Sequence, residues 1–116
     1  MRSKNVIQNK SFSFALSIIE LYKILQQERE FVISKQLLRS ATSIGANIEE
    51  ATAAQTKKDF AHKISISSKE ARETRYWLWL LEKSQLVKGD YTSYLNDITE
   101  IIRILTSIVK TAQKNS

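Results

Sequence analysis

The sequence predicts an all-α protein, an antiparallel up-down-up-down four-helix bundle that forms a single domain over residues 1–116. Three observations support this prediction. Apolar residues recur every three or four positions through four segments, proline is absent, and glycine occurs only at Gly45 and Gly89. Since an all-β fold depends on glycine and proline at its many tight turns, this composition favours long continuous helices. A chain of this length can bury a hydrophobic core without disulfides, which the absence of cysteine excludes.

The first helix is predicted at residues 11–27, where two apolar stripes lie side by side. The first stripe has helical spacing and consists of Phe14, Ile18, Leu21 and Leu25. The second stripe lies next to it and consists of Phe12, Leu16, Ile19 and Tyr22. One stripe is enough to face the core of a bundle, so the second is available for another contact.

The second helix is predicted at residues 33–54, with Ser34 as its expected N-terminal cap. Its apolar stripe consists of Ile33, Leu37, Ala41, Ile44, Ile48 and Ala51. The centre of this helix, residues 40–46, is rich in small side chains. Small side chains let a neighbouring helix approach closely, and this gain offsets the cost of Gly45 in a helix, about 1 kcal/mol relative to alanine.

The third helix is predicted at residues 57–86 and the fourth at residues 91–113. Thr56 and Asp59 have the spacing of a capping box at the start of the third helix. Asp90 is placed to cap the fourth helix. The stripe of the third helix consists of Phe60, Ile64, Ser67, Ala71, Thr74, Leu78 and Leu81, and that of the fourth consists of Tyr91, Leu95, Ile98, Ile102, Leu105, Val109 and Ala112. Short connections make consecutive helices antiparallel neighbours.

Apolar residues beyond these stripes predict a homo-oligomer. The fourth helix carries a second stripe at Tyr94, Ile101, Ile104 and Ile108, and the third helix adds Tyr76, Trp77 and Trp79. Since a bundle helix needs an apolar stripe only about 100° wide, the excess indicates an interface between copies. We expect that interface to include Tyr76, Trp79, Tyr94 and Ile101. The alternative is a broad core that absorbs all of these side chains.

Catalytic chemistry has little support in the sequence, and we expect neither an enzyme nor a cofactor. His62 is the one histidine, so a serine–histidine–acid arrangement would have to be built around it. Di-iron bundles use repeated Glu-x-x-His motifs, which only Asp59 and His62 approximate here. Glu50 and Glu73 could face each other across two helices, but pairing with lysine or arginine is the simpler expectation. No metal is predicted, and the two glycines stand too far apart for a phosphate-binding loop.

One face of the third helix is basic and interleaved with aromatic residues. The chain has 18 basic and 12 acidic residues and a net charge of +6, which favours phosphate-rich partners. The face consists of Lys58, His62, Ser65, Lys69, Arg72, Tyr76, Trp79 and Lys83, with Arg75 at its edge. Cations that bind phosphates beside rings that stack on bases are typical of nucleic-acid contact. The alternative is a solvated face, partly neutralised by Glu70, Glu73 and Glu82. The predicted nucleic-acid contacts are Lys58, Lys69, Arg72, Arg75 and Lys83.

Contact with a membrane is not expected. The longest uninterrupted apolar or aromatic run is residues 76–81, far short of the roughly 20 residues that span a bilayer. The basic N-terminal residues lead into no continuous apolar segment of the kind a signal peptide needs. We therefore expect a cytoplasmic protein.

The second and third predicted helices also resemble a known family. The segments are SKQLLRS at 34–40, TSIGANIEEA at 42–51, KDF at 58–60, KISI at 63–66, KEARET at 69–74 and YWL at 76–78. Together they resemble the small four-helix bundle proteins called 23S rRNA intervening-sequence proteins, and the resemblance covers nearly the whole chain. At matching positions, Gln36, Asn47, Glu50 and Glu73 are expected to form a hydrogen-bonded network that links the second and third helices.

The resemblance implies a bundle that assembles as a homopentamer and has no catalytic residues. Some relatives are encoded inside intervening sequences of ribosomal RNA genes. The related accessory proteins of diversity-generating retroelements bind nucleic acid and a reverse transcriptase. The expected function is therefore that of a non-enzymatic homo-oligomer that associates with RNA, including ribosomal RNA, or with DNA. The alternative is a protein–protein interaction scaffold with no nucleic-acid role.

Overall fold

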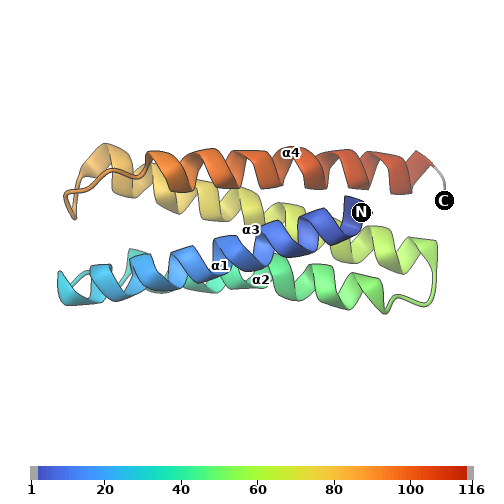
Figure 1. Cartoon of the computed structure of the whole chain (residues 1–116), viewed down its shortest axis with the longest axis horizontal. Helices are drawn as coiled ribbons and strands as arrows, with labels where there is room; N and C mark the ends of the chain where they lie inside the picture. Colours follow the sequence, from blue (N-terminus) through green and yellow to red (C-terminus); the bar gives the residue numbers. More distant parts are fainter. Residues whose placement is uncertain (1–2, 115–116) are drawn as a thin grey trace.

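The computed structural model describes residues 3–114 and contains four helices. They are α1 (Ser3–Gln27), α2 (Ile33–Thr52), α3 (Lys57–Ser84) and α4 (Thr92–Lys114), and the described chain has no strand. Consecutive helices run in opposite directions along one long axis (Figure 1), and the molecule measures 46 × 24 × 20 Å. These features confirm the predicted all-α four-helix fold.

The four helices pack as a ring in which each touches two neighbours. Close packing joins α1 to α2, α2 to α3, α3 to α4 and α4 back to α1. Within the described chain, the diagonal pairs α1–α3 and α2–α4 do not approach each other closely. The outward faces of α1 and α3 therefore lie on opposite sides of the bundle.

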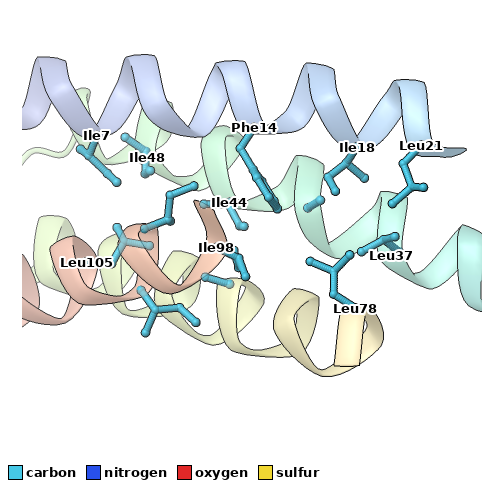
Figure 2. Packing of buried hydrophobic residues seen from close by; sticks show 14 of the residues in the cluster. Ile7, Phe14, Ile18, Leu21, Leu37, Ile44, Ile48, Leu78, Ile98 and Leu105 are labelled. Atoms are coloured by element: carbon cyan, nitrogen blue, oxygen red, sulfur yellow. The ribbon is translucent and has the colours of Figure 1, made fainter. Parts of the chain in front are cut away.

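Helix α1 begins eight residues earlier than predicted, at Ser3 instead of residue 11. The added segment is mostly polar, but Ile7 is fully buried and lies beside Ile48 and Leu105 (Figure 2). Ile7 stands one heptad before Phe14, so it extends the core stripe by a single residue. The other helix ends agree with the prediction to within two residues.

The core consists of the predicted stripes meeting along the bundle axis. Figure 2 shows Phe14 and Ile18 from α1 pointing toward side chains from the other helices, including Ile44 and Ile98. Several predicted stripe residues are only partly buried at the edges of the core, namely Ile33, Phe60, Leu95, Val109 and Ala112. Full burial of a large aliphatic side chain stabilises the folded chain by about 1.5–3 kcal/mol, so these stripes supply most of the driving force for folding.

The turn between α1 and α2 is closed by backbone and side-chain hydrogen bonds. The N–H of Glu30 donates to the Leu25 carbonyl at 2.9 Å and that of Arg29 donates to the Gln26 carbonyl at 3.0 Å. This is the Schellman pattern, and Arg29 takes the left-handed conformation, with φ 62°, that glycine usually supplies. The carboxylate of Glu30 then accepts hydrogen bonds from the first N–H groups of α2, including that of Ile33 at 2.9 Å.

Glu30, and not the expected Ser34, therefore caps α2. Ser34 lies inside the first turn, and its hydroxyl donates to the Glu30 carbonyl at 2.7 Å. Burial alone would raise the pKa of the Glu30 carboxyl, but the hydrogen bonds from Ile33, Ser34 and Val32 outweigh burial and hold the pKa below its ordinary value of 4.5. The carboxylate remains charged at neutral pH beside the positive end of the helix dipole.

The ends of α3 are also held by specific side chains. Thr56 caps its start as predicted, since the Asp59 N–H donates to the Thr56 hydroxyl at 3.0 Å. At its end, Gln85 takes a left-handed conformation, and its side-chain amide hydrogen-bonds to both backbone groups of Gly89. The carboxylate of Asp90 accepts the Thr92 N–H at 3.0 Å, so the expected acid does hold the start of α4.

The α2–α3 seam is lined by small and hydroxylated side chains. The buried Ser67 hydroxyl of α3 donates to the Ile44 carbonyl of α2 at 2.8 Å, and the Thr74 and Ser40 hydroxyls meet at 2.8 Å. On the other side of α2, a Cβ atom at Gly45 would lie 3.4 Å from the Ser11 hydroxyl of α1. The small centre of α2 therefore permits close approach from both neighbours, as the sequence predicted.

We predict that replacing Ser67 will destabilise the bundle in proportion to the size of the new side chain. Ser67→Ala loses one buried hydrogen bond and should lower the free energy of unfolding by about 1 kcal/mol. Ser67→Leu must also separate α2 from α3 and should cost about 1–3 kcal/mol. Urea unfolding measures both, with Ser13→Leu on the exposed surface of α1 as the control. Equal stability of Ser67→Leu and the natural chain would contradict the close packing of this seam.

We also predict a pH-dependent contribution from Glu30. Because its pKa is lower in the folded chain than in the unfolded chain, its stabilisation is complete at neutral pH and is lost as the pH falls through the folded-state pKa. Glu30→Gln should lower the free energy of unfolding by about 1 kcal/mol at neutral pH. The difference should shrink in acid, below about pH 4. Urea unfolding at both pH values tests this, and the matched control is Glu28→Gln, an exposed neighbouring carboxylate. An unchanged neutral-pH stability for Glu30→Gln would refute the capping role.

Candidate nucleic-acid interface

The outward side of α3 carries the basic and aromatic residues that the sequence placed on one face. Its members, hereafter the α3 outer face, are the exposed residues Lys58, His62, Lys69, Arg72, Tyr76, Trp79 and Lys83, together with the half-buried Ser65. Lys58 and Lys83 are 25 residues apart, so the face extends over about 38 Å of helix at a rise of 1.5 Å per residue. The predicted face is therefore one continuous, solvent-accessible surface.

Carboxylates do not neutralise the lysines of this face. Lys58, Lys69 and Lys83 make no ion pair with any residue in the described part of the chain. Arg72 is the one outward cation with an internal hydrogen bond, from its guanidinium to the Thr106 hydroxyl of α4 at 3.3 Å. The charges of this face are thus available to an outside partner.

Two of the three α3 glutamates that could have neutralised the face, Glu70 and Glu73, are held on the α2 side of the helix. Arg39 of α2 donates to the Glu70 carboxylate at 3.2 Å and also pairs with Glu73. Burial alone would raise the pKa of Glu73, but hydrogen bonds from Trp77 and Arg39 outweigh it and hold the pKa below its ordinary value. Glu73 therefore stays charged, and both Glu70 and Glu73 pair with Arg39 and not with the cations of the face. Glu82, the third expected acid, makes no ion pair within the described chain.

Arg75 differs from the other predicted nucleic-acid contacts. Its guanidinium carbon lies 4.8 Å from the ring centroid of Trp79, within the range of a cation–π contact. Its Nε is buried and has no hydrogen-bond partner among the described residues. Arg75 is only partly exposed, so its main contact in the structure is with the indole.

Helix α4 extends the basic surface with two cations that the sequence analysis did not single out. Arg72 reaches across to Thr106, which places this part of α4 beside the α3 outer face. Arg103 and Lys110 lie three residues before and four residues after Thr106, a spacing that puts all three on one side of α4. Both cations are exposed and make no ion pair within the described chain. The sequence could have identified both cations, because they are seven residues apart and lie on a side of the helix away from its apolar stripe.

The residues expected at an oligomer interface do not form one surface. Ile101 is only 2% exposed and belongs to the core of a single bundle, so its placement at an interface between copies is wrong. The physical reason is that α4 packs against both α1 and α3 and needs two apolar stripes. Tyr94 is partly buried against the same core, whereas Tyr76 and Trp79 are about half exposed on α3.

A larger exposed apolar surface lies on α1. Phe12 and Leu16, members of the second predicted stripe, are 67% and 51% exposed, and Ile24, about two turns further along α1, is 49% exposed. We call these three residues the α1 apolar surface. Because α1 is diagonal to α3, this surface lies on the opposite side of the bundle from the α3 outer face. Phe31, Val32 and Leu86 are also exposed, in turns at one end of the bundle.

The predicted polar network is divided among three separate contacts. Gln36 is exposed and accepts a hydrogen bond from Arg39, which links it indirectly to Glu73. Glu50 pairs with Lys63 of α3 at 2.7 Å. Asn47 is half-buried and donates to the Ser43 carbonyl of its own helix at 2.9 Å. The ion pairs between α2 and α3 therefore involve Arg39 and Lys63, which sequence reasoning did not place in the network.

Metal-binding geometry and bilayer-spanning helices are both missing from residues 3–114. No three histidine or carboxylate side chains in this range come together so that they could hold a metal ion. His62 is exposed, while Glu50 and Glu73 are each paired with a cation. None of the four helices combines the length and the hydrophobicity that a membrane span requires.

An open groove of about 940 Å³ lies between the α2–α3 turn and the C-terminal half of α4. Its apolar lining comes from Ala54, Phe60, Ile104, Ile108 and Ala112. The cations Lys57 and Arg103 also contribute to its walls. This groove and the α1 apolar surface each offer a protein partner apolar area to bury.

Comparison with known proteins agrees with this geometry. Residues 3–107 match the family model described as 23S rRNA-intervening sequence protein. The chain belongs to this family. The match confirms the resemblance, which was predicted to cover nearly the whole chain. No curated protein matches the chain.

A solved structure is similar to this 23S rRNA-intervening sequence protein along its whole length. It is the crystal structure of a protein with unknown function from the S23 ribosomal protein family of Bacteroides thetaiotaomicron. The two chains are 50% identical, the match covers 94% of this chain and 99% of the other, and the TM-score is 0.88. At this identity the bundle and its helix order are shared.

Proposed function

We propose that this 23S rRNA-intervening sequence protein is a non-enzymatic, homo-oligomeric bundle that binds RNA or DNA through the α3 outer face and the adjoining Arg103 and Lys110. One observation carries the proposal. The lysines of this face have no carboxylate partner in the described chain, whereas Glu70 and Glu73 of the same helix are paired with Arg39. An unpaired basic surface about 38 Å long suits a phosphate backbone.

The energetic basis of the proposed binding is the release of counterions from the nucleic acid. Each lysine or arginine that contacts a phosphate displaces condensed cations, so affinity falls steeply as salt rises. Lysines act here as point charges, whereas the guanidinium groups of Arg72 and Arg103 can bind two phosphate oxygens at once. Such contacts position a nucleic acid without reading its sequence.

The polar residues of the interior have structural roles that fit a non-enzymatic protein. The hydroxyls of Ser67 and Thr74 hold the α2–α3 seam, and the Glu30 carboxylate caps α2. None of these groups opens toward the α3 outer face as a nucleophile or base would. We propose a cytoplasmic accessory protein that carries or organises a nucleic acid, with ribosomal RNA among the candidate partners.

The proposed oligomer forms through the α1 apolar surface. Phe12 and Leu16 expose more than half of their area, which favours burial against another copy. Packing through α1 leaves the α3 outer face, on the opposite side of each bundle, open to nucleic acid. The family resemblance favours five copies.

We predict that charge reversal on the α3 outer face will weaken nucleic-acid binding. Lys69→Glu and Arg72→Glu should each raise the Kd for a labelled RNA about tenfold and reduce the salt dependence of binding. Fluorescence anisotropy at two salt concentrations measures both effects. Lys35→Glu is the matched control, because Lys35 is an exposed lysine of α2 that also makes no ion pair in the described chain.

Three results of this experiment would count against the proposal. Binding that is absent, or that does not weaken with salt, removes the electrostatic basis. An equal loss for Lys35→Glu would indicate that net charge alone, and not the α3 outer face, determines affinity.

We predict a solution mass that is a multiple of the 13.4 kDa chain, with five copies expected. Leu16→Glu places a charge in the α1 apolar surface and should shift the protein toward single copies while its helical content is retained. Light scattering after size-exclusion chromatography measures the mass. Leu86→Glu, at an exposed apolar position in the α3–α4 turn, should leave the mass unchanged. A natural chain that is already a monomer would disprove the oligomer.

A protein–protein interaction scaffold is the second candidate function. The groove beside Phe60 and Ile108 favours it, since its apolar lining is exposed in a single bundle. This candidate gains support if binding to RNA and DNA is absent and Ile108→Glu abolishes association with a protein partner.

A further inference from the structure

We infer that the α3 outer face binds a single strand, with an unpaired base stacked on Trp79. This inference rests on the proposed nucleic-acid function and names the kind of nucleic acid that the same face accepts. It follows from how the aromatic rings are held and from their order along the helix.

Trp79 is a prearranged stacking surface. Its side chain is 46% exposed although indole is among the most costly groups to leave in water. The Arg75 guanidinium contacts the ring at 4.8 Å from the ring centroid, and the Arg75 Nε has no hydrogen-bond partner among the described residues. The indole is therefore supported within its own helix, and the part of it that remains exposed is available to a base.

Tyr76 extends this stacking surface by one turn. Its ring is 52% exposed and meets Trp77 edge-on, with ring centroids 5.3 Å apart. Trp77 is in turn fixed by the hydrogen bond from its indole N–H to Glu73 at 2.9 Å. The Tyr76 ring is thus held by an anchored neighbour, and the Trp79 ring by contact with the Arg75 guanidinium. Both contacts restrict the rings, which lowers the entropy lost when a base stacks on them.

The order of residues along the face places two rings between cations, an arrangement that suits a single strand. Lys69, Arg72, Tyr76, Trp79 and Lys83 follow one another at steps of three or four residues. This row is about 21 Å long, with cations at both ends and rings between them. A strand with splayed bases can place phosphates on the cations while its bases cover the rings.

A duplex fits the same row poorly. Its bases are stacked and paired inside the helix, so its outer surface would bring phosphates and water against Tyr76 and Trp79. A duplex would use only the cations and leave both rings without a partner. Sequence-tolerant recognition of unpaired segments by rings beside arginines is, by contrast, common among RNA-binding proteins.

The test compares one short RNA as a single strand and as a duplex with its complement. The natural protein should bind the single strand more tightly. Trp79→Leu, which keeps an apolar side chain but removes the ring, should raise the Kd for the single strand roughly 5- to 100-fold. The same variant should leave the Kd for the duplex unchanged, and Trp79→Phe should retain most of the single-strand affinity.

Two measurements separate this inference from simpler explanations. Circular dichroism and the solution mass of Trp79→Leu should match those of the natural chain, because the residue is exposed. A changed mass would assign Trp79 to an interface between copies and overturn the inference.

Failure of the inference is distinguishable from failure of the proposed function. If Trp79→Leu binds the single strand normally while Lys69→Glu does not, the face binds phosphates alone and the stacking role is wrong. If the natural protein binds the duplex more tightly than the single strand, the stacking role is also wrong. If neither nucleic acid binds the natural protein, the proposed function itself is wrong.

Discussion

The close packing of α2 against α3 is the constraint on which the rest of the bundle depends. Small residues in the centre of α2 allow the approach, and the hydroxyls of Ser67 and Thr74 satisfy their hydrogen bonds across the seam. A buried hydroxyl without a partner is costly, so these contacts favour a single register. That register fixes the rotation of α3, and thereby determines which of its residues face outward.

The rotation of α3 also separates its charges by sign. Its two central glutamates face α2, where Arg39 binds them. Lys58, Lys69 and Lys83 face solvent, and Arg72 reaches toward α4. Exposed ion pairs of this kind contribute little to folding stability. Arg39 has a larger effect on the electrostatic potential around the bundle. Its ion pairs prevent the negative charges of Glu70 and Glu73 from offsetting the positive charges of the neighbouring cations. Exposed cations without a carboxylate partner in the described chain, among them Lys69 and Arg103, therefore lie where α3 and α4 face the solvent.

Heptad spacing alone was enough to predict four helices and most of the core, since residues such as Ile18 and Ile98 recur where a bundle requires them. The start of α1 was missed because, among residues 6–10, Ile7 alone is fully buried and so gives no repeating pattern. The Glu30 cap depends on the left-handed conformation of Arg29, which no local spacing indicates. Ile101 was misplaced because a helix with two neighbours needs a wider apolar face. The residues of the α3 outer face were predicted together from their spacing. The ion pairs of Arg39 with α3 and the hydrogen bond from Arg72 to Thr106 were not predicted, because they depend on how two helices are rotated relative to each other.

The diagonal placement of α1 and α3 has a consequence for any assembly joined through α1. Each added copy presents its own α3 outer face, so a closed ring repeats the same binding surface around its circumference. A nucleic acid held by one copy then meets the next at a high effective concentration, and weak individual contacts combine into strong avidity. Occupancy would depend on the length of the unpaired segment, because only a strand that reaches several copies gains this advantage.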